Sequence, residues 1–361
     1  MKVKGRRTGH CYAGTGRTVK RAWCAGRIVV LCVAACLLMS SCQGVRKEEE
    51  KKSIRIGISL YRGDDTFINN IRSIIEEKAK EYERESGIKV TLDIQEAKGS
   101  QNTQNNQVER FIALGRDVLC INPVDRMDTS LIIDKAMTAG VPVVFFNRQP
   151  VEEDMNRWDK LFYVGVDAKE TAVLQGKMVV DLYRKQPEAV DLNGDGVVSY
   201  VMLEGESSHQ DSLIRTEWSV QTLKDGAVPI EKITGGIANW ERSQASALME
   251  QWLIEYPDTI ELVISNNDDM ALGAIDALER AQTEGVNVIG IDGTTPGLEA
   301  LENGKLLGTV SANKEIYCSA VLELAASCAL EEALPEEYPL TDGTYFWTPQ
   351  EILITTIKEN P

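Results

Sequence analysis

Apolar residues follow two different periods that alternate along the chain from residue 53 onward. The run "IRIGISL" at 54–60 is short and nearly continuous, which is typical of a buried strand. The stretch after it places apolar side chains three or four positions apart, the spacing of one helix face: Phe67, Ile71, Ile74, Ile75, Ala79 and Tyr82. The same alternation then predicts strands at 89–97, 117–123 and 141–147, with helices at 101–115 and 128–139.

A second series of the same kind occupies the rest of the chain. It predicts strands at 161–167, 197–203, 229–234, 261–267 and 286–292, with helices at 168–184, from about 211, at 240–256 and at 269–282. Strands and helices that alternate through short links predict a parallel sheet with helices on both faces. We therefore expect an α/β fold of two doubly wound lobes with a cleft between them. Ligands of such sheets bind at the carboxyl ends of strands, where this chain has Asp65, Asn147, Asn267 and Asp292.

The first 41 residues differ from the rest and predict an export signal. They hold eight Lys or Arg and no Asp or Glu, and an apolar run from Ile28 to Met39 precedes two serines. A basic start, a short apolar run and small residues are the pattern of a secretory signal peptide, whereas a spanning helix needs about 20 apolar residues. Cys42 follows at once and resembles the lipidated cysteine of bacterial lipoproteins, with 42–52 as a charged tether. An uncleaved membrane anchor is the alternative.

Charge and cysteine content exclude some classes of protein. The net charge is −16, and it becomes −24 when the basic leader is removed, so binding to nucleic acid is not expected. Five of the eight cysteines lie in residues 1–42, which leaves too few for a disulfide framework. We expect the remaining three, Cys120, Cys318 and Cys328, to be core residues.

The segment "DLNGDGVVS" at 191–199 has the opening of a calcium-binding EF-hand loop. Oxygen-bearing residues alternate and a glycine follows at the sixth position, but position 12, usually a glutamate, is Met202. The residues after the loop predict a strand, so a carboxylate from elsewhere would have to complete the shell. The loop would offer the side chains of Asp191, Asn193, Asp195 and Ser199 and the carbonyl of Val197. The alternative is an Asx-rich turn without metal.

Several segments together resemble the periplasmic galactose/glucose-binding proteins of bacterial sugar ABC transporters. They are "YRGDDTF", "VPVVFFNRQP", "YVGVDAKE", "DLNGDGVVS", "GESSHQDSLIRT", "NNDDMALGA" and "VIGID". They occur in order over residues 53–318, and the calcium-type loop occurs together with a His-x-Asp-x-x-x-Arg element. The chain also resembles, more distantly, ribose-binding proteins and the ligand domains of LacI-type repressors.

The resemblance implies a set of sugar contacts and a source for the missing calcium ligand. The implied contacts are Asp65, Phe67, Asn147, His209, Asp211, Arg215, Trp240, Asn267 and Asp292. Carboxylates, amides and an arginine can bond adjacent hydroxyls, and Phe67 and Trp240 could sandwich the ring. The remote calcium ligand would be Glu261, while Ser199 stands where the family often has glutamine. Ala312 replaces a family asparagine: either Asn313 substitutes through a local shift or one hydroxyl loses its partner, so the sugar stays open.

The resemblance also implies lobe boundaries and a function. One lobe would comprise 53–166 with 311–347, and the other 167–310 with 348–361. We expect a monomeric, lipid-anchored receptor outside the cytoplasm that delivers a glucose- or galactose-like sugar to an ABC permease, with calcium as a structural ion. The alternative is a lipoprotein that presents sugar to a membrane receptor or kinase. A hydrolase with paired carboxylates from Asp65, Asp211 or Asp292 is not expected, since the mature chain has one histidine and no catalytic triad or phosphate loop.

Overall fold

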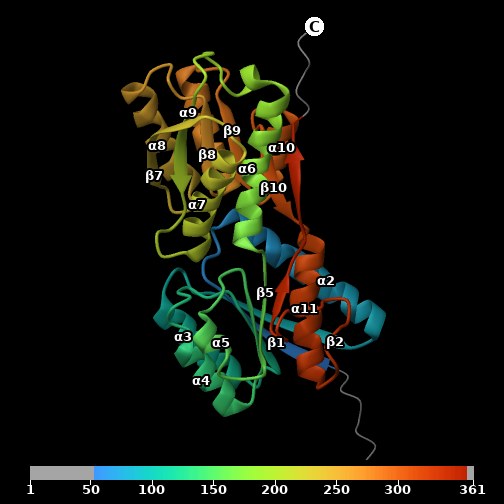
Figure 1. The fold of residues 1–361 in the computed structure, drawn as a ribbon. Coiled ribbons are helices and arrows are strands. Elements are labelled where there is room, and N and C mark those ends of the chain that lie inside the picture. The colour runs from blue at the N-terminus through green and yellow to red at the C-terminus, as the bar shows by residue number, and fades with distance from the viewer. Residues whose placement is uncertain (1–52, 356–361) are drawn as a thin grey trace, which may run out of the picture. The chain divides into compact units, whose positions relative to one another are not determined.

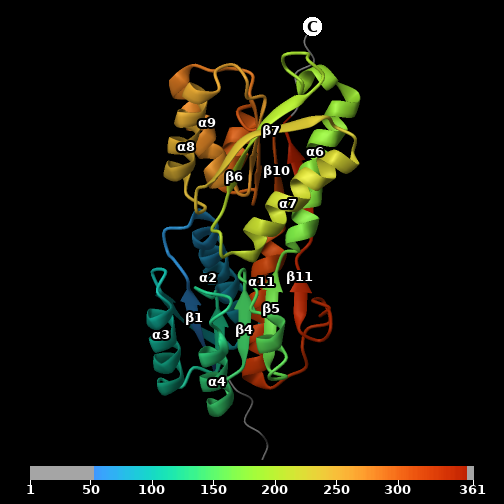
Figure 2. The same cartoon turned by 60° about the vertical axis from the view of Figure 1, so that its left-hand side comes forward.

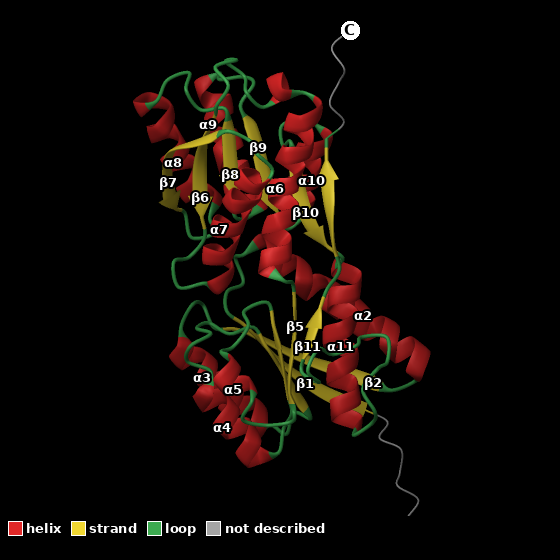
Figure 3. Cartoon of the chain, viewed as in Figure 1, coloured by secondary structure: helices red, strands yellow, loops and turns green. Residues whose placement is uncertain are grey.

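Strands and helices alternate through the chain as the apolar pattern predicts (Figure 3). The computed structural model describes residues 53–355. The predicted leader, Cys42 and the tether lie outside the described residues. Within the described part, no helix is long and apolar enough to cross a membrane.

The first lobe is built on a six-stranded sheet in which every pair of neighbours is parallel (Figure 1). Its order is β11-β5-β4-β3-β1-β2. The strands are β1 (Ser53–Leu60), β2 (Lys89–Glu96), β3 (Val118–Ile121), β4 (Val143–Phe146), β5 (Leu161–Gly165) and β11 (Tyr345–Trp347). The helices are α2 (Thr66–Ser86), α3 (Gln101–Ala113), α4 (Ser130–Ala139), α5 (Glu152–Met155) and α11 (Lys314–Leu330).

The second lobe repeats this plan with the order β12-β10-β9-β8-β6-β7, and β12 alone runs antiparallel to its neighbour. The strands are β6 (Val198–Glu204), β7 (Ile230–Ile237), β8 (Leu262–Ser265), β9 (Asn287–Ile291), β10 (Gly308–Ala312) and β12 (Gln350–Ile354). The helices are α6 (Ala168–Lys185), the 3-10 turn η2 (Pro187–Ala189), α7 (Gln210–Asp225), α8 (Arg242–Glu255), α9 (Asp268–Ala281) and α10 (Thr295–Glu302).

Each sheet is covered by helices on both faces (Figure 2). In the first lobe, α2 and α11 pack on one face and α3 and α4 on the other. In the second lobe, α8 and α9 cover one face and α6 and α7 the other. Ile71 and Ile75 of α2 are buried as their spacing predicts, and Cys120 and Cys318 are buried core residues. Burial on both faces explains why the strands read as continuous apolar runs.

Three short crossovers join the lobes, and hydrogen bonds join the crossovers to one another. They follow β5, β10 and β11. The amide of Thr348 donates to the carbonyl of Gly165 at 2.8 Å, and the amide of Asn313 donates to the carbonyl of Pro349 at 3.0 Å. Residues that follow β1 and β4 of the first sheet and β8 and β9 of the second line the same pocket.

The structure differs from the sequence pattern at the lobe junctions. The strand at 161–167 looked like the start of the second series, but β5 belongs to the first sheet, because the chain crosses over only after it. The first lobe was expected to resume at 311, yet β10 continues in the second sheet through Ala312. Strands β11 and β12 end the two sheets and had no clear apolar signal of their own.

Candidate ligand-binding site

All nine side chains implied as sugar contacts line one pocket at the carboxyl ends of the strands of both lobes. Three further residues, Tyr61, Ile68 and Arg148, line it as well. The free volume between these side chains is about 40 Å³. The pattern of strands and helices therefore led to the correct edge of each sheet.

Asp65 is positioned by the helix that it caps. Its Oδ1 accepts a hydrogen bond from the amide of Ile68 at 2.9 Å, as the N-cap of α2. Its Oδ2 accepts a bond from the hydroxyl of Tyr61. Burial and the neighbouring Asp65 carboxylate raise the pKa of the Tyr61 hydroxyl, which keeps it a proton donor. Each oxygen retains a further lone pair, so this carboxylate can still accept from a ligand hydroxyl.

Three of the pocket residues have a backbone conformation that L-residues seldom adopt. The φ angles of Asn147, Trp240 and Asp292 are 62°, 66° and 112°. Such residues cluster at functional sites because the surrounding structure must impose the conformation. Asn147 is held from both ends: Asn122 donates to its Oδ1 at 3.0 Å, and the hydroxyl of Tyr163 donates to its carbonyl at 2.8 Å.

His209 is fixed as a neutral imidazole with a defined tautomer. Its Nδ1 accepts a hydrogen bond from the amide of Asp211 at 3.1 Å, at the start of α7. The proton therefore resides on Nε2, which can donate to a ligand. Burial, followed by the charges of Arg148, Arg215 and Arg126, holds the pKa of His209 well below its usual range.

Arg215 lies between the carboxylates of Asp211 and Asp292. Its Nη2 donates to Asp211 at 3.4 Å, its Nη1 donates to the carbonyl of Asn266 at 2.9 Å, and the carboxylate of Asp292 is 3.7 Å from Nη1. Burial raises the pKa of both carboxyls, most strongly that of Asp292, and Arg215 opposes the shift. Within residues 53–355, the buried Nε of Arg215 has no hydrogen-bond partner. A buried donor without a partner is costly, so this group favours a polar ligand beside it.

The aromatic side chains stand on different lobes. Trp240 contacts the ring of His209 edge-on, with centroids 5.2 Å apart, and its indole lies against Gly205, where any Cβ would clash. Asn267, the N-cap of α9, donates to the carbonyl of Trp240 at 3.3 Å. Phe67 packs edge-on against Tyr317 at 6.4 Å. Both rings are partly buried and line the pocket.

Three pocket residues that sequence reasoning missed are Tyr61, Ile68 and Arg148. The guanidinium of Arg148 lies 3.8 Å from the Tyr61 ring centroid, and its Nη2 donates to Glu206 of the other lobe at 2.9 Å. A second pair, Arg62 with Glu241, also joins the lobes at 3.0 Å. Tyr61 and Arg148 each directly follow a predicted strand. Their position in the sequence could therefore have identified them as candidate pocket residues.

The structure decides between the two alternatives for the missing asparagine. The Asn313 side chain is exposed and caps α11, accepting from the amide of Ile316 at 3.1 Å. Ala312 is buried and lines a small cavity beside the ligand pocket. Asn313 therefore does not replace the family asparagine through a local shift.

The loop at 191–199 folds around the carboxylate of Glu261. Oε1 accepts from the amides of Leu192 at 2.6 Å and Asn193 at 3.0 Å, and Oε2 accepts from the amide of Ser199 at 2.7 Å. Asp191 accepts from the amides of Gly194 and Gly196, both at 2.9 Å. The resemblance thus identified Glu261 as the residue whose carboxylate contacts the loop, although Glu261 lies 70 positions after Asp191.

The fit of this loop to a cation is partial. Its oxygen donors are of the type that calcium prefers. However, both lone pairs of Glu261 Oε1 are taken by backbone amides, so bidentate binding would require at least one of these bonds to break. Among residues 53–355, no three His, Cys, Asp or Glu side chains gather closely enough to hold a metal ion.

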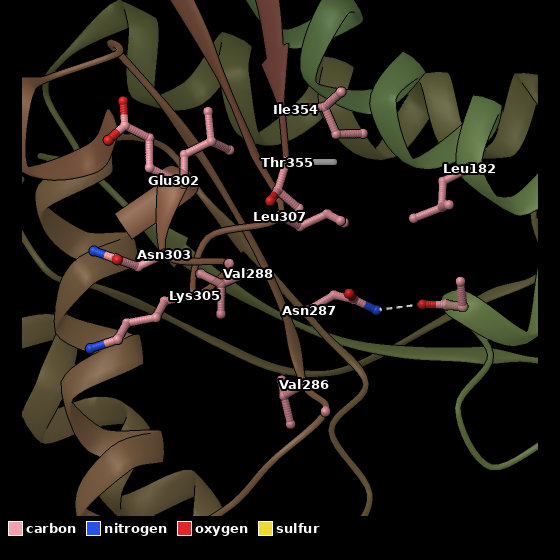
Figure 4. Close-up of a pocket in the computed structure, with 14 residues that line it drawn as sticks. Leu182, Val286, Asn287, Val288, Glu302, Asn303, Lys305, Leu307, Ile354 and Thr355 are labelled. Carbon is pink, nitrogen blue, oxygen red and sulfur yellow. Dashed lines mark hydrogen bonds between the residues drawn. The ribbon is translucent and has the colours of Figure 1, made fainter. Parts of the chain in front are cut away.

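A larger hollow of about 910 Å³ lies elsewhere on the second lobe (Figure 4). It is lined by the first residues of β9, by the segment before β10 and by the end of β12, and Asn287 donates to the carbonyl of Ala189 across it at 2.9 Å. The hollow is thus at the amino ends of the parallel strands. Ligands of such sheets bind at the opposite ends, where the polar side chains converge.

Comparison with known proteins agrees with this two-lobed binding site. Residues 56–332 match the family model of the periplasmic binding protein domain, and the chain belongs to this family. The chain is 32% identical over 283 residues to the D-galactose/methyl-galactoside binding periplasmic protein of Haemophilus influenzae. The aligned region covers 78% of this chain and 83% of that protein. It is 27% identical over 275 residues to the ribose import binding protein of Bacillus subtilis, covering 76% and 81%.

Solved structures show the same fold. An ABC transporter solute-binding protein from Bacillus halodurans C-125, with bound myo-inositol, superposes with a TM-score of 0.70 at 27% identity, over 85% of this chain and 96% of that one. Family membership confirms the resemblance read from the sequence, and it implies a location outside the cytoplasm.

Proposed function

We propose that this protein binds one monosaccharide in the pocket between its lobes and delivers it to an ABC permease. The observation that carries the proposal is the convergence of nine side chains from two lobes, among which the Arg215 Nε has no partner from residues 53–355. Asp65, Asp211 and Asp292 can accept from hydroxyls, while the Nε2–H of His209 and the amide of Asn267 can donate. Both lobes therefore offer hydrogen-bonding groups to one ligand, and the relatives are solute-binding proteins, which supports a carrier of sugar.

The names of the relatives support a class of ligand, small rings with several hydroxyls, but they do not single out one sugar. One is a D-galactose/methyl-galactoside binding protein, another is a ribose import binding protein, and a third was solved with bound myo-inositol. These ligands are all small rings with several hydroxyls. Glucose and galactose remain our leading candidates from the contact set, and Ala312 leaves the choice open.

We propose two further features that the described residues do not reach or settle. Lipidation of Cys42 would tether the protein to the outer face of the cell membrane, and Cys42→Ala should then move it from the membrane to the soluble fraction of cells. Calcium would bind the loop at 191–199 as a structural ion, supported by the oxygen donors of Asp191, Asn193, Asp195 and Glu261. A cation there would stabilise the second lobe away from the pocket.

A thermal-shift screen of aldoses tests the proposed function. A ligand that binds only the folded state adds about 2.7 kcal/mol at 100 times its Kd, so a true ligand should raise the melting temperature by several degrees. Amino acids at the same concentration serve as controls and should leave it unchanged. If no hexose, pentose or inositol shifts the melting temperature, the assignment to sugar binding is wrong.

A further inference from the structure

The carboxylate of Asp292, which lines the pocket, stands on a turn with an unusual backbone, residues 292–294, here named the Asp292 turn. Asp292 has a φ of 112°, and the next residue, Gly293, has a φ of 58°. A Cβ at Gly293 would clash with the hydroxyl of Ser311 on β10, so only glycine fits there. Such a backbone persists only where the surrounding structure imposes it.

The second lobe holds the amides of the Asp292 turn. In chain order, the three amides donate to the carbonyl of Val310 at 2.7 Å, to the hydroxyl of Thr309 at 3.3 Å and to the carboxylate of Asp268 at 2.8 Å. Val310 and Thr309 lie on β10, and Asp268 is the first residue of α9. The turn is therefore fixed from two elements of its own lobe.

The first lobe holds a carbonyl of the same turn. The ammonium group of Lys314 donates to the carbonyl of Gly293 at 2.6 Å. Lys314 is the first residue of α11, which begins directly after a crossover and packs on the sheet of the first lobe. This contact therefore joins the two lobes at the turn that presents Asp292 to the ligand, although Lys314 does not line the pocket.

The charges that face the Asp292 turn are in close balance. Burial raises the pKa of Asp292 well above its usual range and that of Asp268 to about 6. At Asp292 the cations Arg215 and Lys314 oppose this shift, while the carboxylates of Asp268 and Asp65 add to it. Lys314 also opposes the shift at Asp268. The ammonium group thus favours the ionised form of both carboxyls.

Lys314 itself is a partly buried amine. Burial lowers its pKa, while Asp292, Asp268 and Cys318 raise it. A neighbouring cation favours the ionised form of a buried carboxyl, whereas two neighbouring carboxyls without one tend to share a proton. Loss of the Lys314 charge would therefore favour protonation of Asp292. A protonated carboxyl is a weaker acceptor for a ligand hydroxyl than a carboxylate.

We propose that Lys314 is a positioning residue for sugar binding, which holds the Asp292 turn from the first lobe and supplies a cation beside its carboxylate. This inference rests on the proposed function and adds a residue outside the pocket to those that determine affinity. The amine contacts the turn and not the ligand, so its effect reaches the sugar through Asp292.

Titration calorimetry at several pH values tests the proposal, with D-galactose, D-glucose, D-ribose and myo-inositol as probes. Lys314→Met removes the charge and the donor and keeps an unbranched side chain. It should weaken binding about tenfold near neutral pH. The loss should grow in acid and shrink toward about pH 8.5, because a carboxyl with a higher pKa takes up its proton at a higher pH. Lys314→Arg keeps a charged donor and should restore most of the wild-type affinity and pH profile.

The comparison with the wild type isolates Lys314, because the other titratable groups of the pocket are the same in both proteins. Lys305→Met, on an exposed side chain paired with Glu279, is the matched control and should bind as the wild type does at each pH. Melting curves without sugar show whether each variant folds. If Lys314→Met does not fold, Lys314→Gln, which keeps a neutral donor, takes its place and should show the same shift in the pH profile.

Two results would overturn the proposal while sugar binding stands. One is a neutral Lys314 variant that binds as tightly as the wild type. The other is a variant that is weaker by the same factor at every pH, because a purely structural role would not change the pH profile. If the wild type binds no hexose, pentose or inositol, the proposed function fails and this inference fails with it.

Discussion

At the scale of single residues, the pocket controls charge by burial. His209 is neutral because it is buried among arginines, and its Nδ1 already accepts the amide of Asp211. Burial also raises the pKa values of Asp292 and Asp211, and the charge of Arg215 offsets part of this shift. A ligand that donates hydroxyl protons to these carboxylates replaces the water they have lost.

The contribution of His209 to the stability of the protein should become unfavourable in mild acid. Its folded pKa lies below the unfolded value of about 6.5, so below that pH the unfolded chain binds a proton that the folded protein does not. The free energy of unfolding should drop by up to about 1.4 kcal/mol per pH unit in this window. His209→Gln should show a shallower drop in urea unfolding between about pH 5 and 7. The raised pKa values of Asp211 and Asp292 act in the opposite direction. The wild type and the His209→Gln variant both contain these two carboxyls. Equal slopes of the free energy of unfolding against pH in the two proteins would therefore contradict this role of His209.

The sequence predicts those site residues that lie at the ends of strands or within segments that resemble a known family. Asp65, Asn147, Asn267 and Asp292 were expected from position alone, and the others from resemblance. Arg148 and Glu206 could not be paired in this way, because their contact depends on how two lobes meet and no periodicity records it.

At the scale of elements, the loop at 191–199 is held by a carboxylate from another segment. Glu261 precedes β8 and accepts three backbone amides of the loop. From the pattern of the loop, a remote carboxylate was needed only if the loop bound calcium, and the resemblance identified it as Glu261. The short strands β11 and β12 escaped the apolar pattern, since three to five residues at a sheet edge carry little periodicity.

Calcium and Glu261 should have separable effects on stability. If the loop binds calcium, the wild type should melt higher with calcium than with chelator. Asp195→Asn should shrink this difference, because it keeps the turn to Val197 but removes a charged ligand. Glu261→Gln should lower the melting temperature in both conditions, since a side-chain NH₂ would then face the loop amides.

Glu188→Gln, on an exposed side chain beside the loop, is the matched control and should change neither value. Equal melting temperatures of the wild type with calcium and with chelator would show that the loop is an ordinary turn closed by Glu261.

At the scale of the whole molecule, two ion pairs join the lobes next to the pocket. The Arg148–Glu206 pair is the more buried, with side chains 7% and 22% exposed, against 25% and 35% for Arg62–Glu241. Closure about hinges is the motion of periplasmic binding proteins, and contacts that exist only when the lobes meet bias that motion.

Glu206→Gln should therefore speed the release of sugar, although Glu206 does not line the pocket. It leaves the buried Arg148 without a charged partner, and we expect a roughly tenfold faster release with a nearly unchanged association rate. Glu241→Gln, in the more exposed pair, should have a smaller effect. Stopped-flow measurement of the Trp fluorescence gives both rates. A release rate equal to that of the wild type would show that this pair does not hold the lobes together.

The central claim is that a single sugar is bound by both lobes at once, and calorimetric titration of two variants tests it most directly. Asp65→Asn keeps the cap of α2 in the first lobe, and Asp211→Asn is an isosteric change in the second. Each removes one charged acceptor, worth about 1.5–3 kcal/mol, and should raise Kd roughly 10- to 150-fold from a one-to-one wild type. Asp181→Asn, exposed on α6, should match the wild type. If either pocket variant binds the sugar as tightly as the wild type, the site does not span the two lobes.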